Sequence, residues 1–310
     1  MNKILIKKNK KEDTYPKISI EIAQNGKIKY ERSSWIMRVL RIPVVFFLNL
    51  LPSKLSGWLL QTFSSARGGS ADVKKWPTTY KALEVMYTYP DRRARGETSI
   101  FEYFWFYILK NPQALRNRLL LTAQELTSAI KETAKRKPEV CLMSLGSGSA
   151  RAVMMALVGL NHRIKTRVRL IDISRDALHY SRTLAEKMSV DVQIDFFRGD
   201  LWNVEKFCDE NFQPDIIEMV GLLDYLPQEK AIKTIRKIYR VLTLGGWLIT
   251  CNIQPNFERP FLTKGVGWPM IYRTPQETAK IVIEGGFSPF GLRVVCEPLK
   301  IHGLVIAQKL

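Results

Sequence analysis

The second half of the chain constrains the fold most strongly, because apolar runs of strand length alternate there with amphipathic runs of helical length. After Pro138 the expected strands are Val140–Leu145, Arg167–Ile171, Val192–Phe197, Asp215–Met219, Trp247–Asn252, Leu292–Glu297 and Leu304–Gln308. The expected helices are Arg151–Leu160, Arg175–Lys187, Gln228–Leu242 and Pro275–Gly285. Strands that alternate with helices form right-handed βαβ units. The pattern therefore predicts an α/β fold that is doubly wound around a mostly parallel sheet.

Two features near the end of the chain refine this fold. Only Pro298–Gly303 separates the last two expected strands, which is too short for a parallel crossover. We therefore expect an antiparallel C-terminal hairpin that closes the sheet. The preceding helix has a clear start signal, because Thr274 can cap it, Pro275 suits its first turn and Glu277 can complete a capping box.

The first half of the chain has a different character. We divide the sequence into a basic segment, 1–34, that is disordered or forms a short strand near Ile18–Ile22, a helical cap or lid, 35–137, and the α/β domain, 138–310. Residues 1–137 carry 26 Lys and Arg against 11 Asp and Glu, a net charge of +15 out of +19 for the whole chain. Such a basic excess favours a polyanionic partner, either a membrane surface or nucleic acid.

Trp35–Leu60 is the first long apolar stretch and the candidate segment for membrane contact. Its densest apolar run, Ile42–Leu51, is about half the roughly 20 residues that a spanning helix needs. We expect two amphipathic helices broken at Pro52, and no transmembrane helix. They either pack over the α/β domain and cover its pocket, or lie in a membrane interface through residues 35–60. The Lys-rich start has no secretory signal, so we expect a cytoplasmic protein, with membrane association left open.

The cysteines and histidines predict no metal site. Cys141, Cys208, Cys251 and Cys296 lie far apart with no CxxC pair, and the three histidines are scattered. We expect the thiols to be reduced, as in a cytoplasmic protein. The sequence gives no indication of the oligomeric state.

A glycine turn follows the first expected strand of the α/β domain. Leu145-Gly146-Ser147-Gly148-Ser149-Ala150 leads directly into a helix. Glycines let the backbone approach a ligand closely, and a helix start supplies N–H groups and the positive end of a dipole. The third glycine of a dinucleotide fingerprint is replaced by Arg151, and no Gly-Lys-Ser/Thr follows, which argues against NAD and ATP. We predict a cofactor site at this turn.

The end of the second strand supplies a carboxylate for the same site. Asp172 lies 26 residues after Gly146, with Ile173 directly after it. A carboxylate at the tip of the adjacent strand can accept both hydroxyls of a ribose. Capping of the next helix is the alternative role for Asp172, but Ser174 could do this instead.

The third and fourth strand ends complete the predicted site. Asp200, followed by Leu201, is placed to accept a hydrogen bond from an adenine amino group. The fourth strand ends near Val220, where the reacting group of the cofactor would lie. Asp224 and Tyr225 follow closely.

Taken together, residues 138–310 resemble a class I S-adenosylmethionine-dependent methyltransferase. The matching motifs, in order, are Leu145–Ala150, Leu170–Ser174, Gly199–Asp200, Asp215–Leu226 and Leu242–Gly246. The resemblance implies a seven-stranded sheet, S-adenosyl-L-methionine as cofactor and in-line methyl transfer. It implies cofactor contacts at Ser144, Gly146, Ser147, Gly148, Asp172, Ile173, Asp200, Leu201 and Val220.

The sequence departs from the family pattern at three positions. Ser144 stands where an acidic residue is usual, Ala150 replaces the third glycine and Leu244 replaces a proline. Ser144 puts one contact to the methionine amino group in doubt. These departures leave room for a non-catalytic scaffold that binds the cofactor.

The fourth motif argues against a nucleic acid as the methyl acceptor. Val220-Gly221-Leu222-Leu223 lacks the Asn/Asp-Pro-Pro-Tyr/Phe of enzymes that methylate base amino groups, and no cysteine follows a proline. Aromatic residues interleaved with Arg and Lys in 74–118 could still stack bases. An RNA methyltransferase therefore stays as an alternative.

A narrower resemblance concerns the acceptor. Gly221–Leu226, Asn252, Asn256 and Gly267–Arg273 are similar to bacterial methyltransferases associated with making methyl esters of 3-hydroxy fatty acids. This implies O-methylation of a carboxylate or hydroxyl on an apolar small molecule. Arg273 could orient a carboxylate, which needs no base at neutral pH. If a base is used, we consider Asp224, Tyr225 and Tyr272. Both tyrosines could instead shape the pocket, and Arg273 could form a structural salt bridge.

Overall fold

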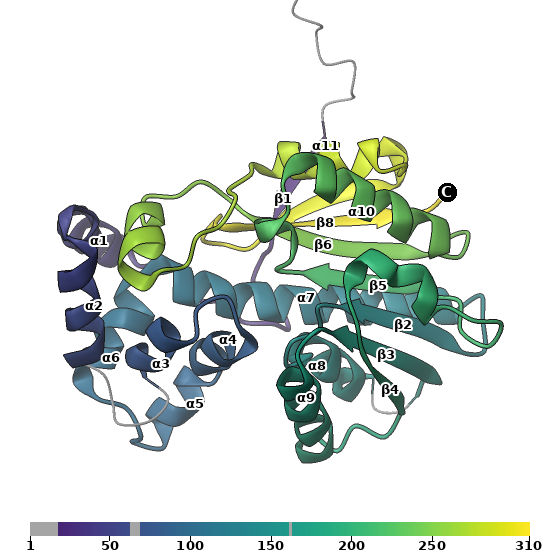
Figure 1. The fold of residues 1–310 in the computed structure, drawn as a ribbon, viewed down its shortest axis with the longest axis horizontal. Helices are drawn as coiled ribbons and strands as arrows, with labels where there is room; N and C mark the ends of the chain where they lie inside the picture. Colours follow the sequence, from purple (N-terminus) through teal and green to yellow (C-terminus); the bar gives the residue numbers. More distant parts are fainter. Residues whose placement is uncertain (1–17, 63–68, 161–162) are drawn as a thin grey trace, which may run out of the picture.

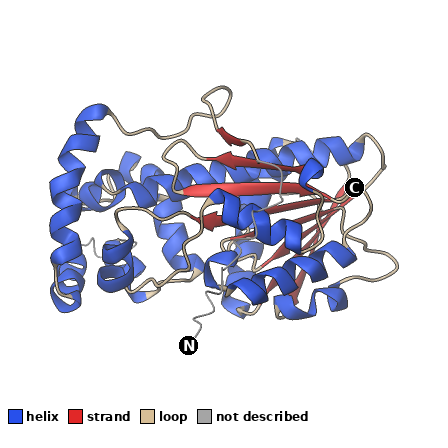
Figure 2. Cartoon of the chain, turned by 90° about the horizontal axis from the view of Figure 1, so that it is seen from above, coloured by secondary structure: helices blue, strands red, loops and turns tan. Residues whose placement is uncertain are grey.

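The computed structural model describes residues 18–62, 69–160 and 163–310, which form an eight-stranded sheet flanked by helices (Figures 1 and 2). The strand order is β1-β7-β8-β6-β5-β2-β3-β4. The strands are β1 Ile20–Ile22, β2 Val140–Leu145, β3 Thr166–Asp172, β4 Gln193–Arg198, β5 Ile216–Val220, β6 Trp247–Ile253, β7 Leu292–Cys296 and β8 His302–Gln308. In this part of the chain β8 alone runs antiparallel to its neighbours, β6 and β7. The predicted doubly wound sheet with an antiparallel C-terminal pair is confirmed.

The predicted number of seven strands is wrong by one. The additional strand, β1, pairs in parallel with β7, and Ile20 lies opposite Val294. Without β1, the backbone groups of β7 on that side would form an open sheet edge. The short strand named as an alternative near Ile18–Ile22 is thus confirmed, but the count of seven did not include it, since only three residues pair.

Helices bury both faces of the sheet. On β2, Val140 and Leu142 pack into one core with α7 Lys110–Ala134, α8 Arg151–Gly159 and α9 Arg175–Lys187. Cys141 and Met143 face the other way, into a second core with η2 Leu201–Phe207, α10 Gln228–Val241 and α11 Pro275–Glu284. The side-chain period of two thus feeds both cores, as expected for a parallel sheet covered on both faces.

The predicted start of α11 is confirmed in detail. The Thr274 hydroxyl accepts a hydrogen bond from the Glu277 backbone N–H at 3.2 Å, and the Glu277 carboxylate accepts one from the Thr274 N–H at 2.7 Å. This is a complete capping box with Pro275 in the first turn.

Two short helical turns, η3 Leu223–Tyr225 and η5 Pro289–Gly291, lie elsewhere in the second half.

A helical cap precedes the sheet. Its elements are α1 Trp35–Leu50, α2 Ser53–Thr62, α3 Ser70–Lys75, α4 Tyr80–Tyr87, α5 Tyr89–Ala94, α6 Ile100–Tyr103 and η1 Phe104–Ile108, joined by η4 Phe261–Val266 from the second half. The helix break predicted at Pro52 is confirmed. The cap has its own core, which includes Val45, Leu60, Met86, Trp105 and Phe261. Within the described ranges no helix is long and apolar enough to cross a membrane.

Helix α7 connects the cap to the sheet. Figure 1 shows it running from the cap along the back of the sheet. Leu126 and Ile130 lie in the core on that face of the sheet, whereas Leu115 near the start of α7 lies in the cap core. The predicted helical region 35–137 thus contains both cap helices and a helix of the sheet layer. The predicted segment 1–34 is described only from residue 18 onward, and residues 1–17 lie outside the described part.

Candidate active site

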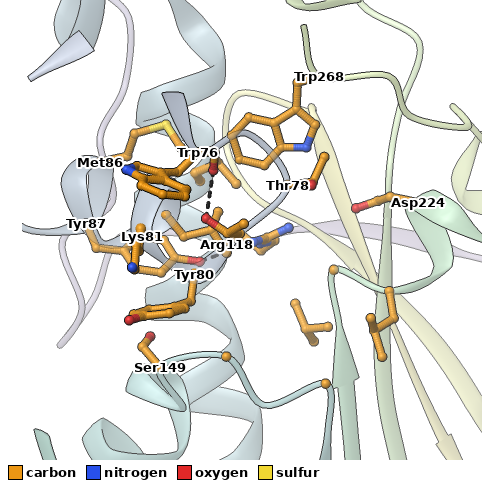
Figure 3. Close-up of a pocket in the computed structure, with 18 of the residues that line it drawn as sticks. Trp76, Thr78, Tyr80, Lys81, Met86, Tyr87, Arg118, Ser149, Asp224 and Trp268 are labelled. Carbon is orange, nitrogen blue, oxygen red and sulfur yellow. Dashed lines mark hydrogen bonds between the residues drawn. The ribbon is translucent and has the colours of Figure 1, made fainter. Parts of the chain in front are cut away.

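The site lies at the point where the order of the strands in the sheet reverses. Strand β2 pairs with β3 on one side and with β5 on the other, and ligands of open α/β sheets bind at such a switch point. A cavity of about 820 Å³ opens there, between the carboxyl ends of these strands and the cap (Figure 3). The helices of the first half therefore line one side of the cavity, and the strand ends of the second half line the other.

The glycine turn takes the left-handed conformation at three residues. The φ angles are +63° at Gly146, +53° at Gly148 and +52° at Ala150. A Cβ atom on Gly146 would lie 2.5 Å from the side chain of Leu222. The sequence predicted that glycine serves the approach of a ligand. The structure adds that Gly146 is also required by its backbone conformation and by Leu222 of the protein itself.

Asp172 fastens this turn to the end of β3. Its carboxylate accepts hydrogen bonds from the Gly148 N–H at 2.9 Å and from the Ser174 N–H at 2.8 Å. Ser174 caps α9, as expected, and accepts from the Ala177 N–H at 3.2 Å. The sequence suggested that Ser174 leaves Asp172 without protein partners, and this is wrong, because Asp172 accepts two backbone hydrogen bonds. Each carboxylate oxygen still has a second acceptor position, and Asp172 lines the cavity.

The other predicted cofactor residues line the same end of the cavity. Gly146, Ser147, Gly148, Asp172, Ile173, Asp200, Leu201 and Val220 all contribute to its wall. The Asp200 carboxylate accepts from the Trp202 N–H at 3.0 Å, which orients it at the start of η2. Ile173 is 69% exposed, so an apolar surface is available beside the glycine turn. Of the predicted set, Ser144 alone is fully buried behind the wall.

Ser144 is explained by its neighbour on β5. Ser144 and Glu218 are paired in the sheet register, and the Ser144 hydroxyl donates a hydrogen bond to the Glu218 carboxylate at 2.5 Å. The other carboxylate oxygen accepts from the Val220 N–H at 2.9 Å. Glu218 is 7% exposed and lines the cavity, and burial raises its pKa to about 7. The acidic group that β2 lacks is therefore present one strand away.

A buried cation, Arg118 of α7, also lines the cavity, and the sequence reasoning did not find it. Arg118 is only 4% exposed, and one of its terminal nitrogens donates to the Tyr87 hydroxyl at 3.1 Å. Its Nε has no hydrogen-bond partner among the described residues. The available signal was its spacing, because Arg118 lies three residues after Leu115 and four before Thr122, on the buried face of α7.

Asp224 faces the same cavity from the other side. Figure 3 shows the Arg118 and Asp224 side chains pointing into it from different walls. One oxygen of Asp224 accepts from the Ile253 N–H at 2.8 Å. Burial raises the pKa of Asp224 to about 6, although the charge of Arg118 opposes this shift. His302 completes this part of the wall, and burial together with Arg118 lowers its pKa well below the usual value, so it is neutral.

The remaining predicted catalytic residues have different surroundings. Tyr225 lines the cavity, but its hydroxyl accepts from the Trp268 indole N–H at 2.6 Å, and burial raises its pKa to about 12. Tyr272 is not part of the cavity wall. The Arg259 guanidinium lies 4.7 Å from the centre of its ring, and burial raises its pKa to about 12. Neither tyrosine is therefore suited to act as a base at neutral pH.

Arg273 does not reach the cavity either. Its guanidinium donates to the backbone oxygens of Leu223 at 2.7 Å and Leu226 at 2.5 Å, and to the Asn252 side chain at 2.8 Å. These contacts enclose it, so the predicted contact with an acceptor carboxylate is replaced by a structural role. Arg273 holds the segment after β5 that carries Asp224.

The cap is fastened over the cofactor end by polar contacts of α4. The buried Glu84 carboxylate accepts from the Arg151 Nε at 2.9 Å and from the Tyr180 hydroxyl at 2.7 Å. The Tyr80 hydroxyl donates to the Asp176 carboxylate at 2.8 Å. These bonds join α4 to α8 and α9 and so hold the cap against the cofactor end of the cavity.

Comparisons with known proteins agree with this geometry. A family model described as "Putative methyltransferase" matches residues 111–309. No curated protein matches the chain. Similar solved structures include a "possible exported protein" from Bordetella parapertussis (TM-score 0.60, 16% identity, 90% of this chain and 99% of that one) and the S-adenosylmethionine-dependent methyltransferase SibL in its apo form (0.53, 15%, 89% and 74%).

At these identities the structural similarities show the fold alone, and the family follows from the sequence match over more than half of the chain. The match begins at Asn111, so it includes α7 together with the sheet. The chain therefore belongs to this methyltransferase family, which confirms the predicted methyltransferase, and it shares its class I fold with SibL, a protein described as S-adenosylmethionine-dependent.

Proposed function

We propose that the chain methylates the carboxylate of an apolar acid with S-adenosylmethionine and so forms a methyl ester. The observation that carries this proposal is Arg118, a permanently charged side chain buried in the wall of a largely apolar cavity. A buried guanidinium is costly unless an anion accompanies it. A carboxylate on the acceptor is the group that matches its charge and its planar donors.

The cofactor end of the cavity fits S-adenosylmethionine. Asp172 would accept from the ribose hydroxyls and Asp200 from the adenine amino group, with Ile173 as an apolar surface beside the base. Glu218 would accept from the methionine ammonium group in place of the acid missing at Ser144. When bound, the cofactor supplies an electrophilic methyl group on a sulfonium. The protein then has to align the acceptor and exclude water.

The acceptor end of the cavity is apolar. It is lined by Leu60, Val73, Met86, Trp105, Leu109, Leu115, Phe261, Val266, Trp268 and Met270. Its total volume of about 820 Å³ lies at the upper end of the roughly 300–1,000 Å³ of ligand pockets, which leaves room for an acceptor beside the cofactor. An acceptor with an apolar body and one anionic head matches both the walls and Arg118.

The protonation states support a carboxylate acceptor. A carboxylate is already ionised at neutral pH and needs no base. Tyr225 and Tyr272 have raised pKa values, and the neutral His302 has a lowered one, so all three are weakly suited to remove a proton. Asp224, with a pKa of about 6, is the candidate whose pKa would suit a base, but a carboxylate acceptor has no proton for it to remove.

The alternatives receive less support. A scaffold that does not catalyse was suggested by Ser144, but Glu218 supplies a carboxylate at the neighbouring position. An RNA acceptor would favour a basic site, whereas most of the side chains that line the acceptor end are apolar. The resemblance that the sequence analysis based on Gly221–Leu226 and Gly267–Arg273 makes medium- and long-chain 3-hydroxy acids the first acceptors to test.

The test uses purified protein, methyl-labelled S-adenosylmethionine and straight-chain acids of increasing length, with and without a 3-hydroxyl. Primary alcohols of the same lengths serve as controls. We expect label in an extractable product that releases methanol in mild alkali, as esters do and ethers do not. Label that resists alkali, or label that enters only RNA from a cell extract, would contradict the proposal.

The variant Arg118→Gln tests whether the buried guanidinium of Arg118 binds the carboxylate of the acceptor. Loss of a buried, hydrogen-bonded charge pair costs about 2–5 kcal/mol, so kcat/KM for acids should fall at least about 30-fold. Affinity for S-adenosylmethionine should stay close to that of the wild type, which controls for misfolding. An Arg118→Gln variant that esterifies acids at the wild-type rate would refute the role of Arg118.

A further inference from the structure

We propose that the outer face of α1 and the start of α2 dock onto an anionic lipid bilayer. This docking face consists of Trp35, Ile36, Val39, Leu40, Ile42, Phe46, Phe47 and Leu50 of α1 and Leu55 of α2. It is distinct from the active site and does not depend on which acceptor the enzyme uses.

Helix α1 differs from an ordinary surface helix, because it is apolar on its outward face as well as at two of its three buried positions. It turns Arg41, Val45 and Leu48 toward the protein. Arg41 is 5% exposed and donates to the Ile108 carbonyl and, at 3.0 Å, to the Ser33 hydroxyl. Its outward face is almost wholly apolar, whereas a surface helix normally presents polar residues to water. Such a helix needs an apolar partner on its outer side.

The docking face is large. Trp35 is 72% exposed, Leu50 67% and Phe47 62%, and the other α1 members are all more than half exposed. Together the nine side chains present on the order of 1,000 Å² of apolar surface, compared with roughly 300–600 Å² for the largest patch on a typical monomer. A patch of this size marks an interaction site or a membrane contact.

The shape of the molecule permits contact with a flat surface. Figures 1 and 2 both place α1 and α2 at one end of the molecule, away from the sheet. A second, apolar cavity of about 480 Å³ lies beside the docking face, lined by Pro43, Phe47, Leu59, Phe101 and Phe104, among others. A lipid acyl chain could enter this cavity while the helix lies on the bilayer.

Charge favours anionic lipid over other occupants. No Asp or Glu occurs between Glu31 and Asp72, and Arg32, Arg38 and Lys54 in this stretch are exposed. Basic residues around an apolar face are typical of interfacial helices. A second copy of the chain would bring the same positive charges together, because a two-fold interface pairs identical surfaces.

The length of α1 indicates contact in the plane of the membrane. Sixteen residues span about 24 Å, less than the roughly 30 Å of the hydrocarbon core. Helix α2 belongs both to the docking face and to the active site, since Leu55 is exposed and Leu60 lines the main cavity. A bilayer bound at the docking face would therefore lie next to the acceptor end of that cavity.

Vesicle sedimentation with the full chain tests this inference. One set of vesicles contains phosphatidylcholine alone, and the other also contains one third phosphatidylglycerol. We expect binding to the anionic vesicles that weakens with salt. The double variant Phe46→Ser/Phe47→Ser should bind on the order of 30-fold more weakly. Phe290→Ser, which changes a phenylalanine that is 89% exposed outside the docking face, should bind as the wild type does.

A charge variant provides a second, milder test. Arg38→Gln/Lys54→Gln leaves the apolar face unchanged, and each lost charge should weaken binding to anionic vesicles about fivefold. Unchanged affinity for S-adenosylmethionine in all variants would show that the site is intact. The inference is overturned if the wild type does not bind anionic vesicles, or if Phe46→Ser/Phe47→Ser binds like the wild type. Self-association in solution that Phe46→Ser/Phe47→Ser abolishes would also overturn it, in favour of an interface between copies.

Discussion

Replacing Glu218 by Gln should weaken cofactor binding and yet stabilise the free protein. Gln keeps the shape of the side chain and can still accept from the Val220 N–H, so the packing around β5 is preserved. The variant lacks the negative charge that would meet the methionine ammonium group. Loss of one member of a buried charge pair costs about 2–5 kcal/mol, and because the amide keeps some hydrogen bonding we expect about 2–3 kcal/mol, or roughly 30–150-fold in Kd.

The stability effect follows from the pKa of Glu218. Burial raises this pKa from 4.5 to about 7, so between these pH values the folded protein keeps a proton that the unfolded chain has lost. The contribution of Glu218 to stability is therefore complete below pH 4.5 and is lost as the pH rises through about 7. Above pH 7 the loss amounts to about 3 kcal/mol. Since Gln does not ionise, Glu218→Gln should be more stable than the wild type at pH 8 and similar to it at pH 4.

Calorimetric titration with S-adenosylmethionine and urea unfolding test both effects. Wild-type affinity should fall about tenfold from pH 8 to pH 6, as the carboxylate becomes protonated, while that of Glu218→Gln should not change with pH. Glu205→Gln, at an exposed position of η2, is the matched control and should behave like the wild type. The reasoning would be refuted if Glu218→Gln bound the cofactor as tightly as the wild type does. It would also be refuted if the Kd of the wild type did not change between pH 8 and pH 6.

Three further substitutions follow from the site. Asp172→Ala removes the acceptor of the Gly148 N–H and of the ribose hydroxyls, so calorimetry should show at least about 30-fold weaker cofactor binding; a smaller loss argues against that role. Gly146→Ala combines a positive φ with a 2.5 Å contact to Leu222, so the free energy of unfolding in urea should fall by about 1–3 kcal/mol. An unchanged free energy of unfolding would contradict this prediction. Tyr225→Phe should leave the pH profile of kcat unchanged; a shifted profile would identify a base.

The sequence was sufficient to predict the fold of the second half. Strands such as β2 were recognised from their apolar runs, and α11 from its capping box, because these signals are local. The extra strand β1 was not counted. Alternation near Ile18–Ile22 indicated a short strand as one alternative, but the pairing of this strand with β7, more than 250 positions later in the chain, leaves no local signal.

The sequence was sufficient to predict which residues gather at the ends of the strands, but not the contacts that depend on packing. Gly146, Asp172 and Asp200 lie together because parallel strands end at one edge of the sheet. The pairing of Ser144 with Glu218 depends on the register of two strands whose residues are 74 positions apart. A single acid within an apolar run indicates an unusual buried group but does not identify its partner.

Tertiary packing also explains why Arg118 lines the cavity whereas the predicted Arg273 does not. Arg273 is the last residue of the segment Gly267–Arg273, which was associated with the acceptor, but its guanidinium donates to the backbone oxygens of Leu223 and Leu226 in the folded chain. Arg118 lies on a helix that the sequence placed in the cap, and only the packing of α7 against the sheet brings it to the cavity. Which arginine faces a cavity is decided by tertiary packing that composition and spacing do not encode.

Equilibrium binding of the acceptor head group tests the central claim most directly. Protein loaded with S-adenosylhomocysteine is titrated with a long-chain acid and with the primary alcohol of equal length, in the wild type and in Arg118→Gln. We predict that the wild type binds the acid at least about tenfold more tightly than the alcohol, and that Arg118→Gln loses this preference. Equal affinity of the wild type for acid and alcohol, or a preference that survives in Arg118→Gln, would contradict the account.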